Sequence, residues 1–170
     1  MEKRTGTGSA IVAAIVLIGD QLSKHWAETW LRTNGEYKIW DGVLHLRYVE
    51  NRGAAFGMMQ GGKWFFLAIT GIACAAMLYF LIKERKRLHF MMTFSIALLL
   101  SGAIGNLIDR VALGYVRDMI YVALIDFAVF NVADMAVTVG CCLLVLDLLF
   151  FKGKKYMEMM DKKPQTGENS

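Results

Sequence analysis

Four long stretches with almost no charged residues constrain this 170-residue chain more than any other feature. Residues 5–19, 64–82 and 90–108 contain no Asp, Glu, Lys or Arg, and residues 127–151 are interrupted only by Asp134 and Asp147. A helix needs roughly 20 apolar residues to cross the hydrocarbon core of a bilayer, and each stretch has about that length. Four such stretches leave too little polar surface for a soluble domain. The sequence therefore predicts an all-α membrane protein with four transmembrane helices.

The composition excludes several other classes of protein. Hydrophobic residues make up 56% of the chain and charged residues only 20%, which is too apolar for a disordered chain. The three cysteines all lie in apolar stretches, so they are interpreted as packing residues and not as a disulfide framework. The three histidines are scattered and form no HExxH pair. We expect neither a metal ion nor an organic cofactor.

Basic residues predict the orientation of the four helices. They gather at the N-terminus, between the second and third stretches, and after the fourth, at positions 83, 85–87, 152, 154 and 155. An even number of spans separates these segments, and the positive-inside rule assigns all three to the cytoplasm. The prediction is spans at about residues 7–27, 64–82, 90–108 and 130–151, cytoplasmic N- and C-termini, and outer loops at 31–63 and 109–129.

Residues 1–155 are predicted to form a single four-helix intramembrane domain. From about residue 152 onward the composition turns polar and basic, and a disordered cytoplasmic tail is predicted over residues 156–170. The net charge of +4 follows from the predicted membrane topology and does not indicate a nucleic-acid partner.

The first outer loop has a pattern of its own. Leu44, Leu46 and Tyr48 alternate with His45, Arg47 and Val49, a period of two that is typical of a half-buried strand. Residues 35–42 begin and end with glycine and are interpreted as turn material. We expect a small extracytoplasmic β element in this loop.

Several ionisable and amide side chains are predicted to lie at one depth of the membrane. Asp20 lies near the outer end of the first span, and Asp118 lies in the outer loop between the third and fourth. Near the outer ends of those two spans lie Asn106, Asp109, Asn131 and Asp134. Ionisable groups in membrane spans are costly and are by default functional candidates. The cluster therefore predicts a functional site near the outer leaflet.

The spacing of these residues adds a second constraint. Asn131 and Asp134 are three residues apart, so they share one face of a helix. Asp20 and Lys24 are four apart and can pair in the same way. Asp109 is expected to form a local ion pair with its neighbour Arg110. Two roles are open for Asn131, because asparagine often caps a helix but can also bind a substrate backbone.

Two chemistries suit such a cluster. Two carboxyl groups that lie close together cannot both ionise, so they can share a proton and activate water for peptide hydrolysis. The alternative is a small proton or ion transporter, in which acids relay charge through the membrane. A relay needs acids at several depths, whereas the middle parts of the second and third spans are apolar. That favours the enzyme, and both readings remain open at this point.

Four blocks of the sequence resemble the signature blocks of bacterial lipoprotein signal peptidases (signal peptidase II, peptidase family A8). They occur in the family's order, at residues 20–24 (DQLSK), 51–56 (NRGAAF), 102–110 (GAIGNLIDR) and 130–134 (FNVAD). The resemblance implies an intramembrane aspartic endopeptidase that removes the signal peptide from diacylglyceryl-modified prolipoproteins, just before the lipidated cysteine. It further implies a multi-pass protein of the bacterial cytoplasmic membrane with its active site near the extracytoplasmic face. The implied partners are prolipoprotein signal peptides, membrane lipids and the inhibitor globomycin, and the chain is expected to be a monomer.

The resemblance also implies a role for each candidate residue. Asp118 and Asp134 match the family's catalytic pair. The positions that match residues lining or supporting the substrate site are Asp20, Lys24, Asn51, Gly53, Asn106, Asp109, Arg110 and Asn131. One departure lies beside the pair, because Arg117 stands where the family usually has an aliphatic residue.

Overall fold

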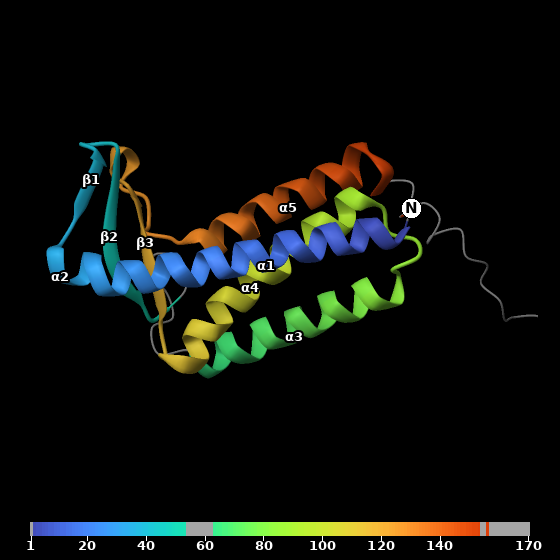
Figure 1. Cartoon of the computed structure of the whole chain (residues 1–170), viewed down its shortest axis with the longest axis horizontal. Coiled ribbons are helices and arrows are strands. Elements are labelled where there is room, and N and C mark those ends of the chain that lie inside the picture. Colours follow the sequence, from blue (N-terminus) through green and yellow to red (C-terminus); the bar gives the residue numbers. More distant parts are fainter. Residues whose placement is uncertain (1, 54–62, 154–155, 157–170) are drawn as a thin grey trace, which may run out of the picture.

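The fold is a helical bundle with a small sheet at one end (Figure 1). The computed structural model describes residues 2–53, 63–153 and 156. The helices are α1 (Glu2–Trp26), α2 (Arg32–Asn34), α3 (Lys63–Lys83), α4 (Phe90–Ala112) and α5 (Val132–Phe150). A π-helical turn, η1 (Ala27–Leu31), joins α1 to α2, and a 3₁₀ turn, η3 (Ala123–Ile125), follows the last strand. The strands are β1 (Tyr37–Trp40), β2 (Leu44–Asn51) and β3 (Val116–Val122).

Three helices among the described residues, α3, α4 and α5, are long and apolar enough to cross a membrane. They coincide with the second, third and fourth predicted spans. The first predicted span coincides with α1, which lies alongside α4 and α5 in the bundle. The start of α1, the connection between α3 and α4, and the end of α5 lie at one end of the bundle, and the sheet lies at the other (Figure 1). A fourth transmembrane crossing and the side on which each end lies stay predictions.

The sheet is larger than the sequence predicts and draws on two separate loops. Its order is β1-β2-β3, and both pairs are antiparallel. The strand expected over residues 44–49 is present as β2 and extends to Asn51. The prediction of turn material over residues 35–42 is wrong for residues 37–40. They form β1, because the tight turn after Trp40 brings Tyr37 opposite Leu46.

Strand β3 lies in the outer loop for which no strand was predicted. Its sequence, VRDMIYV, is rich in β-branched and aromatic residues that favour strands, so a signal for it was present. The charged pair Arg117 and Asp118 obscures this signal, because charged side chains usually face solvent and so argue against a buried strand. In the structure both side chains are buried. β3 pairs with β2 from Leu44 opposite Val122 to Asn51 opposite Val116.

Small residues allow the helices to approach closely around α4, which packs against α1, α3 and α5. A Cβ atom at Gly102 would overlap the Ala133 carbonyl oxygen of α5. A Cβ at Gly105 would lie 2.6 Å from the carboxylate of Asp20 in α1. Further along, a Cβ at Gly140 of α5 would lie 2.8 Å from the Ser95 carbonyl oxygen of α4. The backbones of α4 and α5 therefore meet at contact distance, and the Asp20 side chain of α1 packs directly against the backbone of α4.

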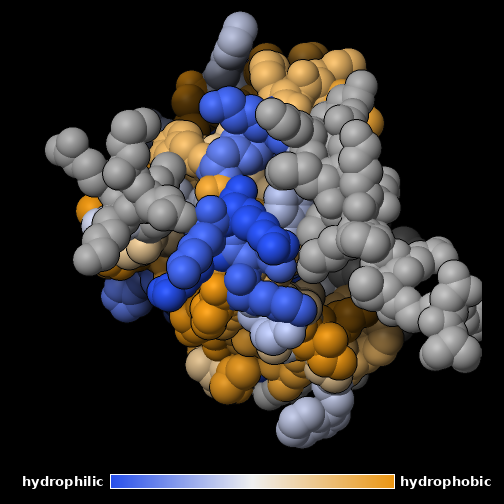
Figure 2. Space-filling model, turned by 90° about the vertical axis from the view of Figure 1, so that its right-hand side faces the viewer, coloured by the Kyte–Doolittle hydropathy of each residue, from blue (hydrophilic) through white to orange (hydrophobic). Residues whose placement is uncertain are grey.

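The end of the bundle away from the sheet has a hydrophilic patch with hydrophobic surface above and below it in the view of Figure 2. Asp147, the second acid of the fourth apolar stretch, lies toward this end of α5, where it is fully buried and its Oδ1 lies 2.8 Å from His89 Nε2. Tyr156, the first residue of the predicted tail, is also buried and packs with Met92 and Ile96. The remainder of that tail lies outside the described residues, as do residues 54–56 of the NRGAAF block.

The close approach of α4 and α5 makes a testable prediction at Gly140. We expect Gly140→Ala to destabilise the protein by about 1–3 kcal/mol, because the added methyl group must displace the backbone of α4. Gly71→Ala in α3 is the matched control, because a Cβ there meets no atom within 4 Å. It should leave stability unchanged or raise it slightly, since alanine is the better helix former. Thermal unfolding in detergent micelles measures both, and equal melting temperatures for the two variants would contradict the prediction.

Candidate active site

Backbone hydrogen bonds join the start of α5 to β3 and so bring together residues that are distant in the sequence. The amide of Ile120 donates to the Phe130 carbonyl oxygen at 2.8 Å, and the amide of Phe130 donates back to the Ile120 carbonyl at 3.0 Å. Met119 N–H also donates to the Phe130 carbonyl, at 3.0 Å. β3 is therefore held by β2 along one edge and by Phe130 along the other. As a result, the first turn of α5 begins beside Asp118.

The alternation of β3 separates its side chains into two sets. Val116 and Asp118 point to one face of the strand and line a cavity. Arg117 and Met119 point to the opposite face, where Met119 packs against Ala27 and Leu31 of η1. A shift of one residue in register would exchange the two sets, so the pairing with β2 and Phe130 decides which acid reaches the cavity.

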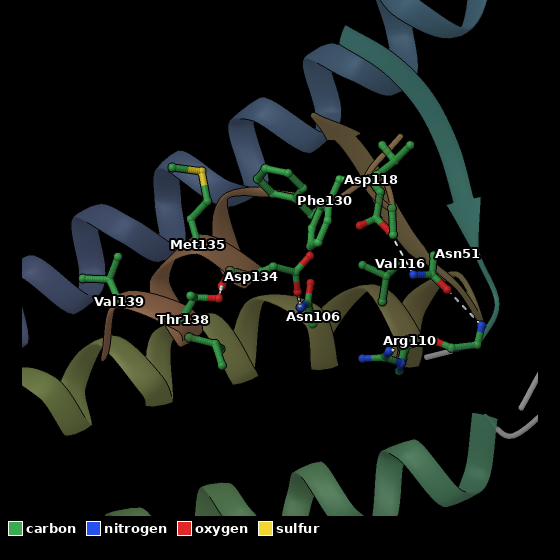
Figure 3. A pocket seen from close by; sticks show the side chains of 15 residues that line it. Asn51, Asn106, Arg110, Val116, Asp118, Phe130, Asp134, Met135, Thr138 and Val139 are labelled. Atoms are coloured by element: carbon green, nitrogen blue, oxygen red, sulfur yellow. Dashed lines mark hydrogen bonds between the residues drawn. The ribbon is translucent and has the colours of Figure 1, made fainter. Parts of the chain in front are cut away.

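The cavity has a volume of about 530 Å³ and contains both predicted catalytic acids (Figure 3). Asp118 comes from β3, Asp134 from the first turn of α5, and Asn106 and Arg110 from the last turns of α4. Asn51 and Gly53 at the end of β2 complete the polar part of the lining. The apolar part comes from Val116, Phe127, Ala128, Val129, Phe130, Met135, Val137 and Val139, with Thr138 beside them.

Two asparagine amides hold the carboxylate of Asp118. Asn131 Nδ2 donates to Oδ1 at 2.6 Å, and Asn51 Nδ2 donates to Oδ2 at 2.9 Å. The side chain is buried, with only 1% of the residue exposed. Burial raises the pKa of Asp118 to about 7, and the negative charge of Asp134 adds to the rise, although both amide donors oppose it. Asp118 can therefore hold or release a proton near neutral pH.

Asp134 is held by a parallel set of donors. Asn106 Nδ2 donates to Oδ1 at 2.7 Å, and the backbone N–H of Asn131 donates to Oδ2 at 3.1 Å. The Asp134 backbone N–H in turn donates to Asn131 Oδ1 at 3.0 Å, which completes a capping box at the start of α5. The catalytic candidate thus also forms part of the helix cap, which restricts its rotamer.

Of the two roles that the sequence left open for Asn131, the structure shows the helix cap, and the amide nitrogen binds residues of the site where a bond to substrate was the alternative. Its Oδ1 atom caps α5, and its Nδ2 atom donates to Asp118 and, at 3.1 Å, to Asn106 Oδ1. An amide nitrogen carries only two hydrogens, so these two bonds use both of them. Asn131 therefore connects the two halves of the site and has no N–H remaining for a substrate.

A buried ion pair supports the site from α1. Lys24 Nζ lies 2.8 Å from Asp20 Oδ2 and donates to Asn106 Oδ1 at 2.9 Å. Asp20 Oδ1 accepts from the backbone N–H of Ala133 at 2.9 Å, and both charged side chains are fully buried. Because Lys24 can only donate, it holds the Asn106 oxygen toward α1 and the Asn106 nitrogen toward Asp134. The predicted pairing of Asp20 with Lys24 is present.

The prediction that Asp109 forms an ion pair with Arg110 is wrong. Asp109 is buried and binds Arg117 instead, with Arg117 Nη2 2.8 Å from Asp109 Oδ1. Arg110, the next residue of the helix, points away from Asp109 into the cavity. There its guanidinium lies 5.0 Å from the centre of the Phe66 ring and donates to the Gly53 carbonyl oxygen at 3.4 Å. Adjacent residues of a helix diverge by about 100° around its axis, which makes an ion pair between them difficult.

Sequence reasoning from the residues alone missed part of the cavity. Asn51 and Gly53 were found only through the family resemblance, because they lie outside every span. The apolar lining at Phe127, Ala128 and Val129 lies in the predicted outer loop 109–129, for which the sequence analysis predicts no role in the site. Thr138 lies four residues after Asp134 on α5, so the helical period would have placed it on the same face.

Comparisons with known proteins identify the family of this chain. The family model of signal peptidase (SPase) II, Peptidase_A8, matches residues 12–150. The chain belongs to the signal peptidase II family. It is accordingly an endopeptidase of the aspartic type.

Individual relatives of this signal peptidase II chain cover most of its length. A lipoprotein signal peptidase of Streptococcus thermophilus is 46% identical over 138 residues, which are 81% of this chain and 90% of the relative. One from Clostridioides difficile is 44% identical over 145 residues, covering 85% of this chain and 97% of that one.

Two solved structures share the fold. A bacterial membrane enzyme determined by the in meso method at 2.3 Å resolution is 33% identical, with a TM-score of 0.78 and coverage of 95% of both chains. Another bacterial membrane enzyme, determined by the same method at 1.9 Å, is 35% identical with a TM-score of 0.75, covering 85% of this chain and 94% of that one.

The double role of Asn131 predicts how two substitutions will differ. Asn131→Ser retains an oxygen that can cap α5 but loses the nitrogen that holds Asp118, so peptidase activity should fall at least about tenfold. Asn131→Ala loses both functions and should also lower the melting temperature by more than Asn131→Ser does. Peptide hydrolysis and thermal unfolding of the same detergent preparations measure the two effects. Normal activity in Asn131→Ser would show that the residue is only a cap.

Proposed function

We propose that this protein removes the signal peptide from diacylglyceryl-modified prolipoproteins, with Asp118 and Asp134 as its catalytic pair. The observation that carries the proposal is that both carboxyl groups line one cavity at the end of apolar helices. Each acid is held by neutral amide donors, and no ion pair among the described residues includes either of them. Two buried acids that face one cavity and have no direct ion-pair partner favour a state in which they share one proton.

In the proposed mechanism the two acids activate a water molecule between them. The ionised acid removes a proton from water as the water oxygen bonds to the scissile carbonyl carbon, and the protonated acid donates a hydrogen bond to the carbonyl oxygen. The C–N bond then breaks as the carbonyl re-forms, and the proton taken from water passes to the leaving amine nitrogen, so that the pair again holds one proton. The raised pKa of Asp118 supports its retention of a proton near neutral pH. Asn51, Asn106 and Asn131 hold the two carboxylates in fixed orientations, which reduces the reorganisation needed in the transition state.

The substrate backbone is proposed to bind Arg110 and the remaining amide hydrogens of Asn51 and Asn106. Each of these asparagines donates one Nδ2 hydrogen to a catalytic acid, so one hydrogen is left. Arg110 faces the cavity and carries five N–H donors, of which one binds Gly53. At this depth the substrate's peptide groups find little water, so donors from the protein must replace it.

The apolar lining suits a hydrophobic signal helix with lipid chains on the adjacent cysteine. Met135 and Val139, four residues apart on α5, line the cavity and are about half exposed on the outside of the bundle. The cavity therefore continues into a surface that would face acyl chains. We propose that the substrate enters sideways from the membrane and that its diacylglyceryl group remains in contact with lipid. Globomycin is proposed to occupy the same cavity.

The remaining parts of the proposal concern placement. We infer that residues 1–155 act as one monomeric domain in the bacterial cytoplasmic membrane, with α1 as its fourth span. The basic residues 83, 85–87 and 152 lie at the end of the bundle opposite the cavity, which supports an active site near the extracytoplasmic face.

Neutralising either acid tests the catalytic pair. Asp118→Asn and Asp134→Asn should each lower cleavage of a lipidated prolipoprotein by at least about a thousandfold, because a shared proton needs both carboxyl groups. Asp126→Asn is the control, because Asp126 lies outside the cavity and binds Tyr121. It should cleave normally, and an unlipidated prolipoprotein should remain intact with every variant.

Two outcomes would contradict the proposal. Cleavage within tenfold of the parent in either asparagine variant would exclude the pair as the catalytic machinery. An ion flux through reconstituted vesicles that Asp134→Asn abolishes, with prolipoprotein left intact by the parent, would favour the transporter alternative.

The hydrogen bond from Asn51 predicts a shift in the pH profile. The donor favours the ionised form of Asp118, so its loss in Asn51→Ala should raise the pKa of Asp118 above about 7. Activity depends on the shared proton and should decline as the pH rises through that pKa. The alkaline decline of kcat should therefore move to higher pH in Asn51→Ala, whatever its maximal rate. The control Asn34→Ala, whose side chain binds an exposed helix carbonyl, should keep the parent's profile, and a shift of Asn51→Ala to lower pH would contradict the argument.

A further inference from the structure

Arg117 forms the densest set of polar contacts around the site, although it lies outside the cavity. Its guanidinium binds Asp109 twice, through Nε at 3.1 Å and Nη2 at 2.8 Å, and its backbone N–H donates to the same carboxylate at 3.0 Å. Nη1 donates to Glu28 Oε2 at 2.8 Å, and Nη2 also donates to Gln21 at 3.3 Å. Only 9% of the residue is exposed. One side chain thus connects β3 to α4, α1 and η1.

The π-helical turn η1 provides the surface on which this face of β3 rests. Glu28 is in the turn itself and binds Arg117, while Ala27 and Leu31 of the same turn pack against Met119. A π-helical turn is wider than an α-helical turn, and in η1 Ala27, Glu28 and Leu31 all face β3. π-Helical turns are rare and occur mostly as single turns at functional sites. The turn thus contributes one charged and two apolar contacts to β3.

Asp118 lies between the two β3 residues that make these contacts. Because strand side chains alternate, anchoring Arg117 and Met119 on one face directs the side chain between them to the other. Asp109 is fully buried, and its ion-pair partners among the described residues are Arg117 and, at 3.8 Å, Lys24. Removing the cationic partner of such a carboxylate would leave a buried, uncompensated charge and would destabilise this part of the fold.

We propose that Arg117 is a positioning residue that holds β3 against η1 and α4 and thereby directs Asp118 into the cavity. The guanidinium lies on the face of β3 opposite the cavity, so it acts through the strand and does not touch the substrate. The inference rests on the proposed catalytic role of Asp118. Loss of the anchor should therefore affect the chemical step more than substrate binding.

Arg117→Lys is the first test, because lysine keeps the charge but cannot bind Asp109 and Glu28 with one planar fork. The kcat for lipidated prolipoprotein should fall at least about tenfold, with KM within about twofold of the parent. Glu28→Gln should lower kcat by about threefold alone and have little further effect in the Arg117→Lys background, because both act through one contact. The control Asp41→Asn removes an exposed ion pair with Lys38 and should leave both constants unchanged.

Hydrogen–deuterium exchange provides a readout that needs no substrate. In Arg117→Lys the amides of β3 should exchange faster, whereas those in the middle of α4 and α5 should exchange as in the parent. Glu28→Gln, whose carboxylate is partly exposed, repeats the measurement should Arg117→Lys fail to fold. A parent protein that cleaves no prolipoprotein would count against the proposed function alone, since the exchange measurement is independent of it. Unchanged exchange in β3, a kcat within twofold of the parent, or a loss confined to KM would overturn the positioning role.

Discussion

The amide group of Asn131 is the interaction on which the arrangement of the site depends. Its oxygen begins α5 by capping the helix, and its nitrogen binds Asp118 of β3 and Asn106 of α4. Hydrogen bonds to a charged group contribute about 1.5–3 kcal/mol each, more than bonds between neutral groups. A single buried side chain thus determines both where α5 starts and where the two acids lie. The cap and the catalytic geometry cannot be altered independently.

A layer of buried charges surrounds this amide at one end of an apolar bundle. Lys24 binds Asp20 behind Asn106, and Arg117 binds Asp109 behind Asp118. Removing one partner of a buried ion pair costs about 3–5 kcal/mol, so each pair holds its helix or strand in one position. The catalytic candidates themselves have no such cation among the described residues. The charges that stabilise the fold are thereby kept apart from those proposed to react.

Close packing of the helices makes this layer possible. Gly102 and Gly105 allow α5 and α1 to approach α4 so closely that Asp20 can bind the backbone of Ala133. A larger residue at either position would separate the elements whose side chains form the site. The same end of the bundle carries the sheet, and β3 is bonded to α5 through Phe130. The cavity exists because helices and strands meet there at hydrogen-bonding distance.

The sequence by itself determined the long apolar helices and the polar residues near their ends, because hydrophobic length and helical spacing are local properties of a chain. α3, α4 and α5 lie where the uncharged stretches are, and Asn131 and Asp134 share a helix face as their spacing requires. Only the tertiary structure decided that Asp109 binds Arg117 and not Arg110, that residues 116–122 pair with β2 in the register that turns Asp118 into the cavity, and that Asn131 both caps and connects. These outcomes depend on strand register and on which helix backbones come into contact. Both are set by interactions between segments far apart in the chain, so no pattern within one segment specifies them.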